Sequence, residues 1–195
     1  TGNMDIDGNL TLTDGTFDVT ATPYSVNLAG NWSNTAGVFT ERTGTVTFDG
    51  AVAQTLTGET FYNLTIANTH ASPSSTNDVE SSAAVTVTNN LAVDDGQFSY
   101  FTASDIDGNV TVASGATLTP AALSGTLTVA GNWTNSGTFT HNSGTVTLDG
   151  TATGKTINPG SSSFNTLTVS GSGGGWTLDT NNLTASTLNV TAGTL

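Results

Sequence analysis

The chain has 195 residues, no cysteine, 23 glycines and only two basic residues against 15 acidic ones, which gives a net charge of −13 at neutral pH. Such a surface repels phosphate backbones and anionic lipid headgroups, so nucleic acids and anionic membranes are excluded as partners. No stretch approaches the length of an apolar membrane span, so membrane insertion is excluded too, and without cysteine there is neither a disulfide nor thiol chemistry.

Threonine makes up about a fifth of the residues, and good helix formers are scarce. The branched Cβ of threonine fits the pleated surface of a strand, whereas glycine and asparagine supply turns. The composition therefore predicts an all-β fold.

A pattern of an apolar residue, a threonine or asparagine, and a second apolar residue returns ten times along the chain at short and fairly even intervals. A short period of this kind is typical of a solenoid whose coils each lean on their neighbours. We expect a parallel β-helix of about ten coils, right-handed because most parallel crossovers are. The ten pattern centres are Thr11, Asn27, Thr47, Thr65, Thr86, Thr111, Thr128, Thr147, Thr168 and Asn189.

Successive side chains of a strand point to opposite faces, so at each centre the two apolar flanks should face inward and the central residue outward. Stacked coils would then place the eight threonine centres in one outward ladder. The segment from Ala67 to Ser82 breaks the period, is polar and contains Pro73. It is predicted to protrude as a loop.

A longer repeat, roughly half the chain in length, lies over the short one, because Asp5-Ile6-Asp7-Gly8-Asn9 returns as Asp105-Ile106-Asp107-Gly108-Asn109. We interpret residues 1–195 as a single continuous β-solenoid built from two five-coil repeats, about 1–100 and 101–195. Two Ig-like β-sandwiches would also fit a repeat of this length. The shorter period favours the solenoid, since sandwich strands do not return with one pattern at near-equal steps.

The segments Ala130-Gly131-Asn132-Trp133-Thr134-Asn135-Ser136-Gly137-Thr138-Phe139-Thr140 and Gly144-Thr145-Val146-Thr147-Leu148-Asp149-Gly150, with their copies in the first half, resemble Thr/Asn/Gly-rich repeats of large prokaryotic surface proteins. Those repeats are similar to haemagglutinin-like and autotransporter-like parallel β-helices. The resemblance implies an extracellular stalk, adhesin or coat. It implies no binding residue, because the repeat defines a scaffold and not a site.

Catalysis by a β-helix needs carboxylates and a basic group gathered on one face. Arg42 and Lys155 are about six coils apart, roughly 29 Å at the spacing of strands, and His70 and His141 are about three coils apart. Arg42 and Lys155 cannot share a site, and neither histidine has an obvious acidic cluster beside it. Hydrolysis by carboxylates alone is the open alternative, since acidic residues are plentiful, but we predict that the protein is not an enzyme.

Calcium is a candidate ligand, because alternate carboxylates precede a glycine turn at Asp5 and Asp7 and again at Asp105 and Asp107. Asp14, Asp94 or Asp95 on adjacent coils could complete the shell. The other interpretation is that these side chains only cap tight turns.

Two further surfaces could bind a ligand. Trp32 and Trp133 occupy equivalent positions, and if exposed they could stack on the sugar rings of surface glycans; buried, they would belong to the scaffold. Paired threonines suggest an ice-binding face, but Asn27 and Asn189 interrupt the row, so we expect the pairs not to stay in one register. The pairs are Thr11/Thr13, Thr45/Thr47, Thr86/Thr88, Thr126/Thr128, Thr145/Thr147 and Thr166/Thr168.

The residues near both ends still follow the coil pattern, since Asp5 to Leu12 copies Asp105 to Val112 and the last pattern centre is Asn189. An open strand edge recruits another strand unless it is capped. We therefore expect an extracellular or cell-surface structural protein, a subunit of a filament, fibre or stalk that forms a head-to-tail homopolymer. A carbohydrate-binding or adhesin β-helix is the alternative, and ice binding a third.

Overall fold

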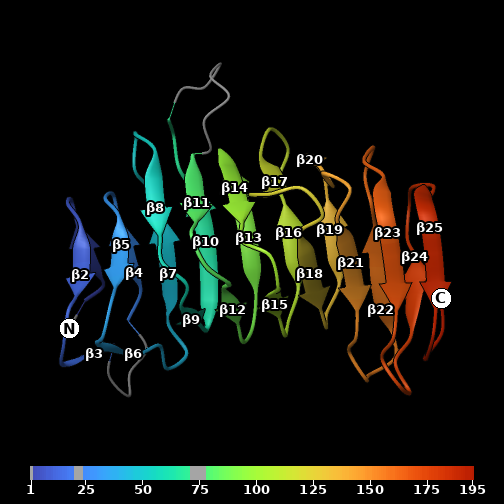
Figure 1. The fold of residues 1–195 in the computed structure, drawn as a ribbon, viewed down its shortest axis with the longest axis horizontal. Coiled ribbons are helices and arrows are strands. Elements are labelled where there is room, and N and C mark those ends of the chain that lie inside the picture. The colour runs from blue at the N-terminus through green and yellow to red at the C-terminus, as the bar shows by residue number, and fades with distance from the viewer. Residues whose placement is uncertain (1, 20–23, 71–77) are drawn as a thin grey trace.

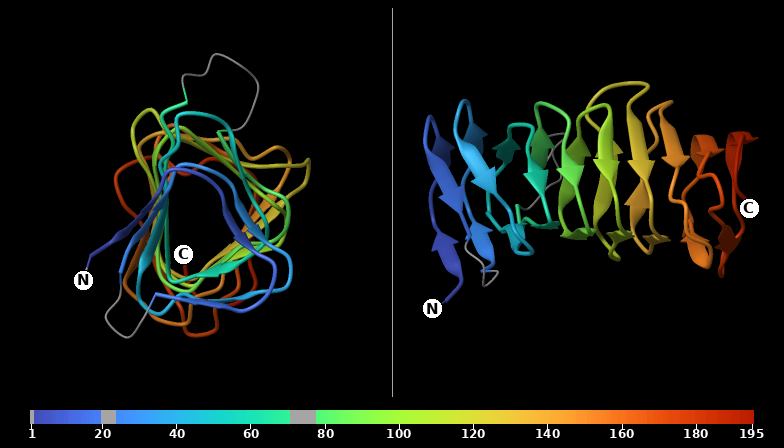
Figure 2. Two further views of the ribbon diagram at one scale, coloured as in Figure 1. Left: turned by 90° about the vertical axis from the view of Figure 1, so that its left-hand side faces the viewer. Right: turned by 90° about the horizontal axis from the view of Figure 1, so that it is seen from below.

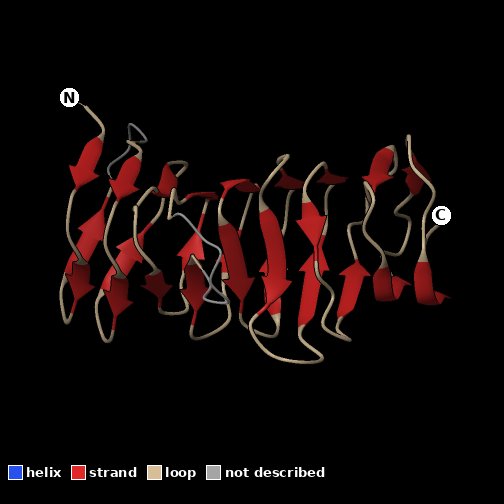
Figure 3. Ribbon diagram, turned by 90° about the horizontal axis from the view of Figure 1, so that it is seen from above, coloured by secondary structure: helices blue, strands red, loops and turns tan. Residues whose placement is uncertain are grey.

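The computed structural model describes residues 2–19, 24–70 and 78–195. These residues form 25 short strands: 23 belong to three parallel sheets through which the chain winds in the same order, and two form a separate pair (Figure 1). The strands lie across the long axis of the molecule, and loops at the corners join one sheet to the next (Figure 3). The described residues contain no helix long and apolar enough to cross a membrane.

Each turn contributes one strand to each sheet in the middle of the solenoid. The first sheet contains β1 (Met4–Ile6), β4 (Val26–Leu28), β7 (Thr45–Phe48), β10 (Asn63–Ala67), β13 (Leu91–Asp95), β16 (Val110–Val112), β19 (Trp133–Asn135), β22 (Lys155–Asn158) and β24 (Trp176–Leu178). The second contains β2 (Leu10–Leu12), β5 (Trp32–Asn34), β8 (Gln54–Leu56), β11 (Val79–Ser81), β14 (Gln97–Tyr100), β17 (Thr117–Pro120) and β20 (Thr138–Phe139). The third contains β9 (Thr60–Phe61), β12 (Thr86–Val87), β15 (Ser104–Ile106), β18 (Thr126–Val129), β21 (Thr145–Leu148), β23 (Phe164–Val169) and β25 (Ala185–Val190). In the first two turns its place is taken by the separate pair β3 (Thr16–Asp18) and β6 (Val38–Thr40).

The predicted parallel β-solenoid is confirmed, and the sandwich alternative is wrong because neighbouring strands pair in parallel throughout the three sheets. Seen from the N-terminal end, the first coils run clockwise as they recede from the viewer, which makes the coil right-handed (Figure 2, left). The nine strands of the first sheet are separated by eight turns, close to the ten expected. The pattern centres are spread unevenly over these turns: the turn from β10 carries both Thr65 and Thr86 and the turn from β16 both Thr111 and Thr128. The turn from β13 carries none, and Asn189 follows β24, beyond the eighth turn.

The inward direction of the apolar flanks is confirmed: Val46 and Phe48, for example, are buried in one continuous core. The single outward ladder of threonines is wrong. The eight threonines divide among the sheets because the turns differ in length. The turn from Leu64 to its partner Leu91, for example, is half as long again as the turn from Val46 to its partner Leu64. Thr11 lies in the second sheet; Thr47, Thr65 and Thr111 lie in the first; Thr86, Thr128, Thr147 and Thr168 lie in the third.

The two halves of the chain repeat the same packing on different faces. Trp32 packs on Phe39 and Phe61 with ring centroids 4.8 and 5.3 Å away, and Trp133 packs on the equivalent Phe139 and Phe164 at 4.9 and 5.3 Å. Trp32 belongs to the second sheet and Trp133 to the first. Likewise β1 lies in the first sheet and its copy β15 in the third. Each of these segments of the second repeat therefore lies one sheet earlier in the winding order than its counterpart in the first repeat.

Asparagine side chains fix the register of the turns at one corner. The Oδ1 atom of Asn90 accepts the backbone N–H of Asn109 at 3.1 Å, Asn109 Oδ1 accepts that of Asn132 at 2.8 Å, and Asn132 Oδ1 accepts that of Thr156 at 2.8 Å. The first half repeats this with Asn9 and Asn31. Each bond satisfies a backbone donor that the short strands leave unpaired at the corner.

The predicted loop from Ala67 to Ser82 is only partly in view, because residues 71–77 lie outside the described residues. Val79–Ser81, at its end, is strand β11, paired on one side with β8 and on the other with β14. The coil therefore resumes earlier than the polar composition suggested.

Candidate functional site

The basic side chains do not meet, as expected. Arg42 follows β6 and forms an exposed ion pair with Asp18, with Nη2 2.7 Å from Oδ2, and this partner raises the pKa of Arg42. Lys155 lies in β22, six turns further on; its Nζ is 4.5 Å from the centre of the Trp176 ring and donates to the Ala152 carbonyl. Burial lowers the pKa of Lys155. Each cation is occupied with its own neighbours.

His70 and Asp78 form the one histidine–carboxylate pair among the described residues, with Nδ1 3.1 Å from Oδ1. The other carboxylate oxygen of Asp78 accepts the backbone N–H of Gln97 at 2.7 Å. Behind it, the buried Asn68 side chain donates to Gln54 Oε1 at 2.8 Å, and Gln54 donates to carbonyls of the preceding turn. A hollow of about 260 Å³ opens in front of the pair. The network fastens the turns at this corner and leaves no carboxylate oxygen of Asp78 free.

The two predicted calcium loops lie far apart in the solenoid, as two separate candidate sites. Asp5 and Asp7 lie at the first turn and Asp105 and Asp107 at the fifth, on different sheets. Asp49 neighbours the first pair and Asp149 the second, in place of the expected Asp14, Asp94 or Asp95. Among the residues that the structure describes, no three histidine, aspartate or glutamate side chains converge closely enough to hold a metal ion.

Burial, with the neighbouring negative charges, raises the pKa of carboxyl groups in both clusters. Burial, and then the neighbouring carboxylates Asp5 and Asp7, raise the pKa of Asp49. Burial followed by Asp107 and Asp149 raises the pKa of Asp105, and burial is again the largest cause of the raised pKa of Asp149. The carboxylates of each cluster repel one another, and among the described residues Lys155 is the one cation that lies beside them.

The tryptophans do not form an exposed stripe. Trp32 and Trp133 are fully buried, and each lies within a cluster of phenylalanines. The interpretation that they stack on sugar rings is therefore wrong, and they belong to the scaffold. The alternation of inward and outward residues predicts this, because each tryptophan takes an inward position of its strand.

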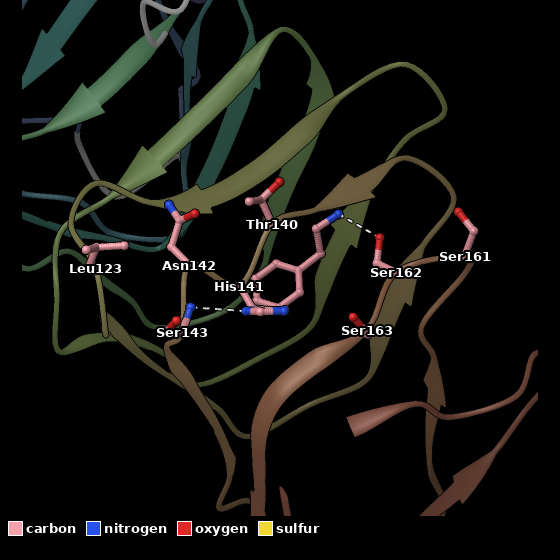
Figure 4. A pocket seen from close by; sticks show the side chains of 9 residues that line it. Leu123, Thr140, His141, Asn142, Ser143, Ser161, Ser162 and Ser163 are labelled. Atoms are coloured by element: carbon pink, nitrogen blue, oxygen red, sulfur yellow. Dashed lines mark hydrogen bonds between the residues drawn. The ribbon is translucent and has the colours of Figure 1, made fainter. Parts of the chain in front are cut away.

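Another hollow, of about 480 Å³, lies beside the turn after β20 (Figure 4). His141 and three consecutive serines, Ser161 to Ser163, face it, and Leu123 stands at its edge with 79% of its surface exposed. His141 Nδ1 accepts the N–H of Ser143 at 3.1 Å, and Ser162 Oγ accepts that of Phe139 at 2.9 Å. Its polar atoms are thus partly used within the protein, and nothing in it points to one class of ligand.

The six threonine pairs do not stay in one register, as expected, because Thr11 lies in the second sheet and Thr45 and Thr47 lie in the first. Three pairs on the third sheet nevertheless align with one another. Thr126, Thr145 and Thr166 pair across β18, β21 and β23, and so do Thr128, Thr147 and Thr168. The residues between them face the core, so six threonine side chains stand on one outward surface. The turns are nearly equal in length here, which keeps both rows aligned. The rows continue into β25 as Thr187 and Asn189.

The remaining candidate surfaces are the two ends of the coil stack. At the C-terminal end Leu188 and Val190 occupy inward positions of β25 and are 49% and 52% exposed. At the other end Met4, in β1, is 44% exposed. Their equivalents inside the stack are buried. The sequence pattern alone did not indicate that Met4, Leu188 and Val190 are exposed.

Comparison of the chain with protein-family models, with curated proteins and with solved structures gives no match.

Proposed function

We propose that the protein is a structural element of an extracellular or cell-surface fibre or stalk, in which β-solenoids stack head to tail. The observation that carries the proposal is the exposure of inward-facing apolar residues, Leu188 and Val190 at one end and Met4 at the other. Apolar side chains that are buried everywhere else in the stack gain the same burial when another coil is added.

Two features of the side surfaces support a structural role. The basic groups are dispersed and bonded to their own neighbours, and the acidic clusters lie on separate faces. A regular rod that presents many short strands resists bending because each turn is bonded to the next in up to three sheets. The high negative charge keeps such rods apart sideways, so that growth is favoured only at the ends.

Electron microscopy and sedimentation velocity of the purified chain over a range of concentrations test the proposal. We expect linear particles whose length grows with protein concentration and whose width is that of one solenoid. Compact monomers at every concentration would contradict it. Incubation with a panel of polysaccharides checks the non-enzymatic role, since release of reducing ends that survives purification would contradict that part.

Ice binding is a second candidate, favoured by the two aligned threonine rows on the third sheet. Within each row the threonines follow one another about 4.8 Å apart along the stack, and the two rows together form a regular hydroxyl surface. Thermal hysteresis is the measurement: a bulky Thr147→Tyr should abolish it, while Thr47→Tyr on the first sheet should not. No hysteresis in the unaltered protein would end this candidate. For glycan binding, the burial of both tryptophans removes the residues that suggested it.

A further inference from the structure

The chain contains an internal junction between its two repeats that can serve as a template. Strand β12, near the end of the first repeat, pairs with β15, the first strand of the second, with Thr86 beside Asp105 and Val87 beside Ile106. Two backbone bonds hold the pair: Asp105 N donates to Val85 O at 2.9 Å, and Asp107 N donates to Val87 O at 2.8 Å. The inward residues of both strands are fully buried.

The two ends of the chain are copies of the two sides of this junction. Strand β1 is the counterpart of β15, and the segment from Asp5 to Asn9 is identical to that from Asp105 to Asn109. Leu188-Asn189-Val190 in β25 is the second repeat's counterpart of Val85-Thr86-Val87. Each end therefore carries one half of a contact that the protein already makes once within itself.

We propose that β1 of a second copy of this chain adds to the free edge of β25 in the register of the internal junction, with Asp5 beside Asn189 and Ile6 beside Val190. The inference rests on the head-to-tail assembly proposed above and specifies its geometry. The exposed Leu188 and Val190 become covered by Met4 and Ile6, as Val85 and Val87 are covered by Ser104 and Ile106.

The register has a consequence for the shape of the fibre. Strand β1 belongs to the first sheet of its own copy, whereas β25 belongs to the third. Docking as in the template therefore rotates each copy by one face, about a third of a turn, relative to the copy before it. By the same offset Thr194 and Leu195 lie beside Leu10 and Thr11, as Leu91 and Ala92 lie beside Val110 and Thr111. The ladder then crosses the contact in two of the three sheets.

The turns of the internal junction approach so closely at one corner that only a glycine, Gly108, fits there. A Cβ on Gly108 would lie 2.5 Å from the carbonyl carbon of Asn89 in the preceding turn, and closer still to its oxygen. At the equivalent Gly8 a Cβ would meet nothing within 4 Å, because no described turn precedes it. In the proposed contact Ala192 of the preceding copy takes the place of Asn89. Gly8 is then needed for assembly and not for the fold of the single chain.

Cross-linking tests the register directly, because the chain has no cysteine of its own. The variant Asp5→Cys is mixed under oxidising conditions with Asn189→Cys, with Thr187→Cys or with Thr177→Cys. Asn189→Cys reports the template register, Thr187→Cys a shift along β25 to the next outward position, and Thr177→Cys an unrotated addition of β1 to β24. We expect a covalent dimer with Asn189→Cys at least tenfold more abundant than with either control.

The outcomes separate this inference from the function it rests on. Linear particles with preferred cross-linking to Thr177→Cys or Thr187→Cys overturn the register and leave head-to-tail stacking standing. A protein that stays monomeric at every concentration overturns both the register and the head-to-tail stacking. In a second measurement, Gly8→Ala should keep the melting temperature of the monomer and raise the concentration needed for assembly at least tenfold. Assembly of Gly8→Ala at the concentration of the unaltered protein would overturn the proposed packing at this corner.

Discussion

The duplication offers a matched pair of substitutions that measures how tightly the turns are packed. Gly108 and Gly8 have the same sequence neighbours, and neither has a positive φ, so alanine strains the backbone of neither. They differ in what lies against them. Gly108 faces the Asn89 carbonyl group, whereas Gly8 faces open space. Any difference between Gly108→Ala and Gly8→Ala therefore reports the approach of one turn to the next.

The structure sets the size of the effect. Real Cβ atoms do not come within 3.0 Å of such neighbours, so with a carbonyl carbon at 2.5 Å the turns must separate by half an ångström or more. Overpacking of this kind costs about 1–3 kcal/mol, which lowers the melting temperature of a chain of this size by roughly 2–12 °C. We expect that fall for Gly108→Ala, and no change for Gly8→Ala at a concentration where the protein is monomeric.

Thermal unfolding followed by far-ultraviolet circular dichroism is the assay. A melting temperature of Gly108→Ala equal to that of the unaltered protein would refute the reasoning, because it would mean that the turns are free to move apart at this corner. A fall for Gly8→Ala as large as that for Gly108→Ala would refute it as well, since the cost would then come from the glycine's own backbone.

Three further predictions follow from the same contacts. Trp176→Phe should lower the free energy of unfolding in urea by about 0.5–1.5 kcal/mol more than Trp133→Phe does. The reason is that Trp176 Nε1 donates to Gly131 O at 2.9 Å, whereas Trp133 Nε1 has no partner among the described residues. Equal losses for the two variants would contradict this. Burial raises the pKa of Asp149 above its usual 3.8, so ionisation of this carboxyl group disfavours the folded state, and the stability of the protein falls as pH rises through the raised pKa. Asp149→Asn should therefore raise the melting temperature at neutral pH and leave it unchanged near about pH 3. A rise of equal size at both pH values would mean that the effect comes from packing and not from charge. With a net charge of −13, end-to-end assembly should strengthen when salt rises from about 0.01 M to about 0.15 M, as measured by sedimentation; assembly that weakens with salt would indicate a contact held by ion pairs.

The candidate sites show where sequence patterns stop being informative. The equivalent positions of the two tryptophans suggest a ligand surface, but their place in the strand alternation makes them inward residues, and both are buried. The motif with Asp5 and Asp7 returns in the second repeat and can be read from the sequence. That Asp49 lies close to these carboxylates cannot, because two complete turns of the solenoid separate it from Asp5 along the chain. The threonine rows on the third sheet needed successive turns of nearly equal length to align, and no single motif records the length of the turns that follow it.

The amino-acid sequence by itself determined the class of fold, because strand alternation and a short period are local properties. Apolar residues on either side of a threonine must face one way, and a pattern that returns at such short intervals can be buried only by stacking. What only the tertiary structure decided is the face on which each motif lies. Turns of unequal length, such as Val46 to Leu64 and Leu64 to Leu91, carry identical strand patterns to different sheets, because the extra residues are absorbed at corners where no periodicity constrains them. The rotation of the second repeat by one face, and with it the geometry of both ends, follows from the sum of those turn lengths around a closed core.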